Sequence, residues 1–174
     1  LRVVRDIPYG VELTVGDGSA EAVAPHAWIH DFTMMTSDSN DVDLAASKEK
    51  FEAAFARIWT RDVEDDGFNR LVFRAGLTWR EIVVLRAYCK YLGQINIPFS
   101  EAYMQDALVG NPELACLLVD LFHARCDPSL GVAAARKMVR ASVDIEGRLE
   151  DVANLDEDRI IRRYYNLIRA TLRT

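Results

Sequence analysis

The chain has 174 residues and a mass of 19.7 kDa, which leaves room for one domain or one domain with a smaller appendage. Its 50% hydrophobic and 28% charged residues are typical of a soluble globular protein. The three cysteines show no CxxC spacing, which argues against a disulfide framework and favours a reducing, cytoplasmic location. The best apolar stretch, residues 114–122, contains Asp120 and is too short to span a membrane.

The net charge of −6 is unevenly distributed along the chain. Residues 1–43 carry 2 basic and 8 acidic side chains, whereas residues 44–174 carry 19 of each. Binding to nucleic acid requires several Lys and Arg contacts to phosphate, so an acidic chain of this kind is a poor candidate for it. The chain opens at Leu1 without a signal segment, and we therefore expect a piece of a longer protein.

Residues 1–35 are predicted to form β-strands, because they are rich in β-branched and aromatic residues. The expected strands cover residues 3–7, 9–15 and 26–34, with a turn at 16–19. A hairpin or three-stranded sheet of this size must pack on something else, either the following helices or a sheet outside the chain. Residues 36–43 contain turn formers and acidic residues and are predicted to be a linker.

From residue 44 onward the apolar residues recur with a helical period. The predicted fold is mainly α: a helical bundle of about six or seven helices in a domain covering 44–174, preceded by a small antiparallel β element. Helices are expected over about 44–61, 67–75, 79–93, 100–109, 112–126 and 156–172, with 129–152 as one longer helix or a broken pair.

Several helix ends have recognisable caps. Thr78 and Glu81 have the spacing of a capping box, and Asn111 followed by Pro112 is expected to cap the next helix. Gly93 is expected to end the helix that begins after Thr78. The apolar stripes expected to face the core include Leu44, Phe51, Phe55, Ile58 and Trp59 in the first helix, and Ile160, Ile161, Tyr164, Leu167, Ile168 and Leu172 in the last.

The sequence contains neither GxGxxG nor GxxxxGK[ST], so no nucleotide site is predicted. His26 and His30 lie on one face of a predicted strand, but HExxH and a third ligand are missing. His123 is expected to be a hydrogen-bonded structural histidine, and Cys89 and Cys116 are expected to be small apolar core residues. We therefore predict no catalytic, cofactor-binding or metal-binding residue in this segment.

Five residues are candidates for an interface. Arg159, Arg162 and Arg163 give the last helix a positive surface that suits an anion or a partner, although bases after an acidic first turn also complement the helix dipole. Trp79 and Arg80 lie inside the capping box, between Thr78 and Glu81, and suit either a partner or a contact between helices.

Three long stretches resemble the large bacterial NAD-dependent glutamate dehydrogenases: DGFNRLVFRAGLTWREIVVLRAYCKYLGQ (66–94), FSEAYMQDALVGNPELACLLVDLFHARCDP (99–128) and LDEDRIIRRYYNLIRATLRT (155–174). WIHDFTM (28–34) resembles the end of the ACT-like portion that precedes the helices in that family. The resemblance implies that residues 1–35 are the tail of an ACT-like module and that the catalytic domain follows the helices.

By this resemblance the parent enzyme converts L-glutamate, NAD and water to 2-oxoglutarate, ammonium and NADH. The segment itself is expected to bind no cofactor. It is expected to couple N-terminal regulatory modules to the catalytic domain of the same chain and to aid assembly of a homo-oligomer, without nucleic acid or membrane as a partner. The alternative is an amino-acid-sensing, ACT-like allosteric module.

Overall fold

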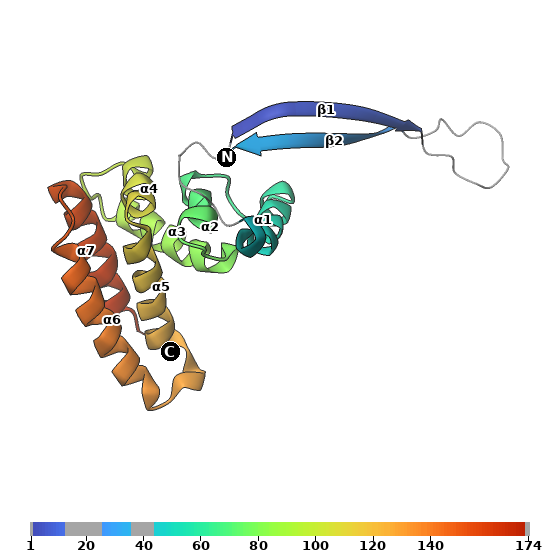
Figure 1. The fold of residues 1–174 in the computed structure, drawn as a ribbon. Helices are drawn as coiled ribbons and strands as arrows, with labels where there is room; N and C mark the ends of the chain where they lie inside the picture. Colours follow the sequence, from blue (N-terminus) through green and yellow to red (C-terminus); the bar gives the residue numbers. More distant parts are fainter. Residues whose placement is uncertain (1, 13–25, 36–43, 173–174) are drawn as a thin grey trace. The chain divides into compact units, whose positions relative to one another are not determined.

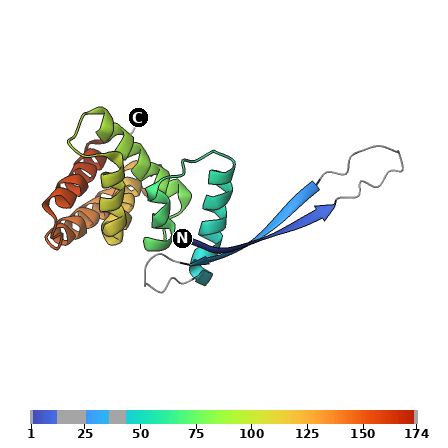
Figure 2. The ribbon, with the colours of Figure 1, turned by 90° about the horizontal axis from the view of Figure 1, so that it is seen from above.

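The computed structural model describes residues 2–12, 26–35 and 44–172, and the chain divides into two compact units, 1–42 and 43–174. In the described part, the first unit is a two-stranded ribbon and the second contains seven α-helices (Figures 1 and 2). The expected mainly α fold with a small antiparallel β element in front is confirmed.

The ribbon pairs β1 (Arg2–Glu12) with β2 (His26–Met35) in antiparallel register, so that Pro8 lies opposite His30. The prediction of separate strands at 3–7 and 9–15 is wrong, because β1 runs through Pro8 without a break. Each strand of a two-stranded ribbon has one free edge, where a residue without an N–H group is tolerated. The predicted turn at 16–19 and the linker at 36–43 lie outside the described residues.

Cross-strand contacts hold the face of the ribbon that carries Trp28. The Trp28 ring lies against Gly10, where an added Cβ would be 3.6 Å from the indole. His30 Nδ1 is 2.9 Å from Asp6 Oδ1, and the His30 ring stacks on Phe32 at 5.6 Å between centroids. Trp28 is nevertheless 65% exposed. The side chain of His26 is outside the described part, so the predicted histidine pair stays a prediction.

The helical unit begins with α1 (Leu44–Trp59), a 3₁₀ turn (Gly67–Arg70) and the short α2 (Leu71–Arg74). α3 (Trp79–Gln94), α4 (Glu101–Gly110) and α5 (Pro112–Cys126) follow. A second 3₁₀ turn (Pro128–Leu130) leads to α6 (Ala133–Leu149) and α7 (Leu155–Ala170). The segment expected to form one longer helix or a broken pair is thus a single helix after a 3₁₀ turn.

The predicted capping box has the expected geometry, and Ser100, at the expected start of the next helix, caps α4. The Glu81 N–H donates to Thr78 Oγ1 at 3.4 Å, and the Thr78 N–H donates to Glu81 Oε2 at 2.7 Å, which completes the capping box. Ser100 Oγ accepts from the Tyr103 N–H at 3.2 Å. α3 ends at Gln94, one residue beyond the predicted Gly93, and Asn96 adopts the left-handed conformation at φ 54°.

Asn111 is the N-cap residue of α5 and Pro112 the first residue of the helix, as predicted, but the Asn111 side chain makes no capping hydrogen bond. Its amide nitrogen instead donates to Ala107 O at 2.8 Å and to Glu157 Oε2 at 2.9 Å, which ties the α4–α5 turn to α7. α4 and α5 are bent by 100° at this turn. Among the described residues no single helix is long and apolar enough to cross a membrane; only the bent α4–α5 pair reaches that length and composition together.

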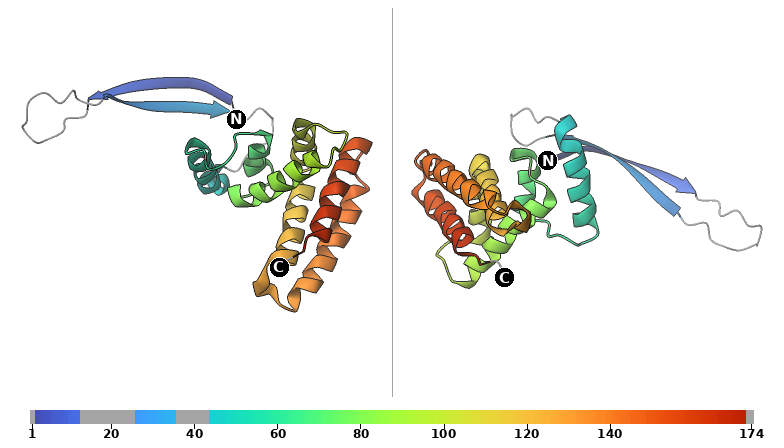
Figure 3. Two further views of the ribbon diagram at one scale, coloured as in Figure 1. Left: turned by 180° about the vertical axis from the view of Figure 1, so that it is seen from behind. Right: turned by 90° about the horizontal axis from the view of Figure 1, so that it is seen from below.

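The core of the helical unit lies around α5, which packs against both α6 and α7 (Figure 3). Leu85, Leu118, Ile161 and Tyr164 are fully buried. Burial of a side chain of this size stabilises the fold by roughly 1.5–3 kcal/mol. The apolar stripe expected in the last helix is confirmed for Ile160, Ile161, Tyr164 and Ile168, which are all buried.

The apolar stripe of α1 is the main exception. Ala54 is its buried residue, whereas Phe55 is 50% and Trp59 78% exposed. Among the other helices α1 packs mainly on α2 and α3, so only one narrow face is covered. The prediction that Leu172 is buried is also wrong: it is 81% exposed, because α7 ends at Ala170.

A buried ion pair joins α3 to the preceding 3₁₀ turn. Asp66 accepts from Arg86 Nε at 2.6 Å and from Arg86 Nη2 at 2.9 Å, and the two side chains are 14% and 7% exposed. Asp66 also caps the 3₁₀ turn by accepting from the Phe68 N–H at 3.0 Å. Arg86 Nη2 reaches Asn69 Oδ1 at 3.1 Å as well. The Arg86 guanidinium thus holds the 3₁₀ turn (Gly67–Arg70) against α3.

Replacement of Asp66 tests this pair. Asp66→Ala leaves a buried guanidinium without its counter-ion, and we expect it to lower the free energy of unfolding by about 3–5 kcal/mol. The matched control is Asp106→Ala, which removes an exposed ion pair with Arg70 and is expected to cost less than about 1 kcal/mol. Urea denaturation followed by circular dichroism measures both, and equal losses would contradict the central role of Asp66.

Candidate interaction surfaces

The described residues contain no group of three or more His, Cys, Asp and Glu side chains arranged to hold a metal ion. Their noteworthy features are three surfaces on the helical unit: the arginines of α7, an aromatic and arginine cluster on α1 and α3, and a groove between α3 and α7.

The α7 arginines differ in how they are engaged. Arg162 Nε donates to both carboxylate oxygens of Asp158, at 2.9 and 2.8 Å, and Arg159 Nη1 donates to Asp156 at 3.3 Å. Both pairs lie within α7, beside the acidic first turn that complements its dipole. Arg163 is exposed and makes no hydrogen bond or ion pair to another described residue. Arg163 is therefore the α7 candidate with the freest guanidinium.

The indole of Trp79 is contacted by two arginines. The guanidinium carbons of Arg57 and Arg80 are 5.2 and 5.0 Å from the centroid of the indole, within the range of cation–π contacts. Trp79 is half-buried against the core, whereas Arg80 is exposed. Arg57 also bonds Asp62 at 3.0 Å, and this hydrogen bond is the main reason why the pKa of Asp62 is lowered.

α1 also carries an aromatic ladder that begins at Phe73 of α2. Ring centroids are 5.3 Å apart for Phe73 and Phe51, 6.0 Å for Phe51 and Phe55, and 5.8 Å for Phe55 and Trp59. The ladder begins beside the core and ends at the exposed indole of Trp59. Aromatic residues and arginines are enriched among the residues that dominate binding at protein interfaces, so this cluster is suited to a partner. Phe51, Phe55 and Trp59 were expected to face the core.

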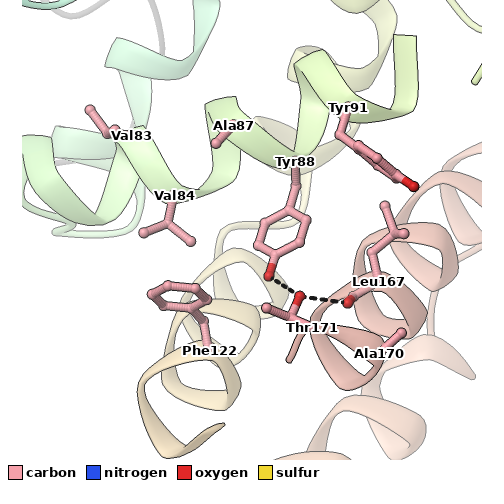
Figure 4. Close-up of a pocket in the computed structure, with 9 residues that line it drawn as sticks. All are labelled: Val83, Val84, Ala87, Tyr88, Tyr91, Phe122, Leu167, Ala170 and Thr171. Atoms are coloured by element: carbon pink, nitrogen blue, oxygen red, sulfur yellow. Dashed lines mark hydrogen bonds between the residues drawn. The ribbon is translucent and has the colours of Figure 1, made fainter. Parts of the chain in front are cut away.

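The third surface, which we call the α3–α7 groove, has a volume of about 570 Å³ (Figure 4). α3 contributes Val83, Ala87 and Tyr91, which recur every four residues along one face. α7 contributes Leu167 and Ala170 from the opposite side. Val83 is 38% and Tyr91 49% exposed, so an apolar face of α3 is left open to solvent.

Two of the hydroxyl groups in the groove, those of Tyr88 and Thr171, bond to each other. Tyr88 Oη and Thr171 Oγ1 are 2.5 Å apart, and Thr171 Oγ1 donates to Leu167 O at 2.8 Å (Figure 4). Since the Thr171 proton is directed at that carbonyl, Tyr88 is the donor in the first bond. Burial is the main cause of the raised pKa of Tyr88. The backbone oxygen of Thr171 is held by Arg125 Nε.

Cys89 and Cys116 do not have the environment of a nucleophile. Burial raises the pKa of Cys89, which is 1% exposed, and that of Cys116, which donates to Ala75 O at 3.2 Å. His123 differs from its prediction as a bonded structural histidine, because its side chain is about half exposed and its Nε2 lies 3.9 Å from Glu81 Oε1.

The raised pKa values of Cys89 and Cys116 predict that their thiols are alkylated slowly. A raised pKa lowers the thiolate fraction near pH 8, so we expect Cys116 to react with iodoacetamide more slowly than an ordinary cysteine, with a rate that still rises above pH 9. Peptide mass spectrometry between pH 7 and 10 follows each cysteine separately. Cys116 in urea-unfolded chain is the reference, and equal rates in the native and unfolded chain at pH 7 would contradict the prediction.

The chain is similar to segments of much longer known proteins. Residues 63–128 match the family model "Glutamate dehydrogenase, helical motif 3". The whole chain is 39% identical to part of the NAD-specific glutamate dehydrogenase of Halomonas elongata and of Pseudomonas aeruginosa, and covers 10% of each. For the Mycobacterium tuberculosis enzyme of the same name the identity is 42%, over 76% of this chain and 8% of the relative. The chain thus spans about a tenth of the length of these relatives.

Proposed function

We propose that this chain, which is homologous along its whole length to one segment of the NAD-specific glutamate dehydrogenases, is a non-catalytic coupling and assembly segment of such an enzyme. The parent would oxidise L-glutamate with NAD and water to 2-oxoglutarate, ammonium and NADH. NAD would bind to another part of the polypeptide. The observation that carries the proposal is a set of packed helices that present three exposed surfaces, while burial raises the pKa values of the Cys89 and Cys116 thiols.

The proposal assigns a role to each part of the chain. Residues 1–35 would be the tail of an ACT-like module, 36–43 its linker, and 44–174 the helical domain that contacts the N-terminal regulatory modules and the catalytic domain. The exposed apolar residues of the ribbon, such as Trp28, support a partner for it outside the described residues. Assembly of the parent as a homo-oligomer would place the cluster of Trp79 and Arg80, and the α7 surface of Arg159, Arg162 and Arg163, at contacts between domains or subunits.

Charge reversal tests these contacts in the full-length enzyme. Arg80→Glu and Arg163→Glu change exposed side chains, so the fold should remain intact while a contact that uses them weakens by about 2 kcal/mol, roughly thirtyfold. Arg140→Glu on α6 is the matched control, because Arg140 is 85% exposed and lies 3.9 Å from Asp144. Mass photometry over a dilution series measures assembly, and NADH formation measures activity. Unchanged assembly and turnover in both variants would rule out these two contacts.

An amino-acid sensor is the second candidate, and the observation in its favour is the exposed two-stranded ribbon, since ACT-like modules commonly bind amino acids at sheet or subunit interfaces. Isothermal titration of the chain with a panel of amino acids tests it. A sensor would give saturable binding that is lost in Trp28→Ala, which removes the largest exposed side chain on the ribbon. Absence of heat with every amino acid would remove this candidate for the present chain.

A further inference from the structure

The outer face of α6 carries apolar residues that the helical unit leaves in contact with solvent. Val132, Val139 and Val143 follow one another at intervals of seven and four residues, and they are 99%, 65% and 63% exposed. Residues at this spacing lie along one side of a helix, and α6 is an outer helix of the unit (Figure 3). We propose that this face pairs in antiparallel orientation with the same face of a second copy of the chain.

Gly147 lies on the same face and has no reason within the chain to be a glycine. Glycine in the interior of a helix is destabilising relative to alanine. A Cβ added at Gly147 would meet no atom within 4 Å, so its own surroundings would accept a side chain. A glycine at a contact between helices lets the two axes approach closely. Val143 and Gly147 also line a hollow of about 640 Å³ with Leu117 of α5, which can receive an apolar side chain.

The charges at the two ends of this face oppose the dipole of α6. Arg136 lies in the first turn, which contains no acidic residue, and Glu150 is the C-cap residue. A helix dipole favours the reverse order, which α7 follows. Arg136 and Glu150 form no hydrogen bond or ion pair with another residue in the described part of the chain. Arg162 of α7 attracts Glu150 from a distance, but its guanidinium is bonded to Asp158.

An antiparallel copy centred on Val143 compensates these charges. Positions 136 and 150 are both seven residues from 143, so Arg136 of each copy lies opposite Glu150 of the other. Positions 139 and 147 are both four residues from 143, so Val139 of each copy lies opposite Gly147, where no side chain blocks it. The second copy thus brings an acidic group to the N-terminus of α6 and a basic group to its C-terminus, as the dipole favours.

The size of this face indicates a weak contact. α6 has 17 residues and is about 25 Å long, so one pair of such helices buries less than the roughly 1,600 Å² of a standard interface. The inference deepens the assembly role in the proposed function and rests on it, because other contacts of the parent would add to this one. Arg140, which is paired with Asp144 within α6, lies outside the row of Val139 and Val143.

Disulfide trapping in the chain detects such a weak contact. Val143→Cys places one thiol of each copy at the symmetry axis, and Cys116→Ser removes the thiol that lines the same hollow. We expect a disulfide-linked dimer on non-reducing electrophoresis after mild oxidation. The matched control is Val139→Cys with Cys116→Ser, whose two new thiols would be about 12 Å apart along the helix axes, too far for a disulfide. We expect a yield at least tenfold lower for it; equal yields, or no dimer with Val143→Cys, would overturn the proposal.

An exchange of charges tests the register. Arg136→Glu and Glu150→Arg each place like charges opposite one another, and each should lower the Val143→Cys dimer yield roughly tenfold at low salt. The chain with both exchanges has opposite charges again and should recover the yield. Both exchanges agree with the dipole of α6, so the melting temperature should not fall. Unchanged yields in the single variants, or no recovery in the double variant, would overturn the proposal.

The trapping experiment separates this inference from the proposed function, because its readout requires no turnover. A parent without NAD-dependent glutamate oxidation would refute the proposed function, while the dimer of Val143→Cys chains would still decide the pairing of α6. Absence of that dimer would refute the α6 pairing and leave the contacts of Arg80 and Arg163 to their own charge-reversal test.

Discussion

The buried ion pair between Asp66 and Arg86 is the constraint on which the first half of the helical unit depends. Asp66 accepts two hydrogen bonds from the guanidinium and one from the backbone of the 3₁₀ turn, so a single carboxylate sets both the start of that turn and its position on α3. Phe68, on the same turn, is fully buried and lies under the guanidinium at 5.9 Å. Lysine would not replace Arg86, because a single ammonium cannot reproduce the planar fork.

The helical unit combines a closed interior with a surface that still requires partners. α5 is surrounded by α6 and α7 and supplies much of the core, while α1, on the outside, exposes Phe55 and Trp59. The α3–α7 groove and the α1 ladder have the same character: aromatic or apolar residues at helical spacing that no described element covers. Such surfaces are expected in a segment that belongs to a larger polypeptide, where neighbouring domains supply the missing contacts.

Local signals in the sequence predicted the elements well. Thr78 and Glu81 are three residues apart and define a cap without any tertiary information, and the apolar period of α3 placed Leu85 and Cys89 inside. Arg86 was missed, although it lies four residues after the buried Ile82 and thus on the same inner face; the acidic partner twenty residues earlier was the available signal. The predicted break at Pro8 was wrong because a proline is tolerated at the free edge of a two-stranded ribbon. Only the strand pairing shows that β1 lies in such a ribbon.

Features that depend on distant residues were not predictable. Asn111 has the sequence context of a cap, yet its partner Glu157 is 46 residues away. The groove exists only because α3 and α7 lie side by side, and no periodicity within either helix reveals that pairing. The Tyr88–Thr171 bond in the groove spans 83 residues, compared with 20 for Asp66 and Arg86. Closing a longer loop costs more chain entropy. We therefore expect the 3₁₀ turn that holds Asp66 to pack on α3 early in folding and α7 to dock late, so that the α3–α7 groove is among the last surfaces to form.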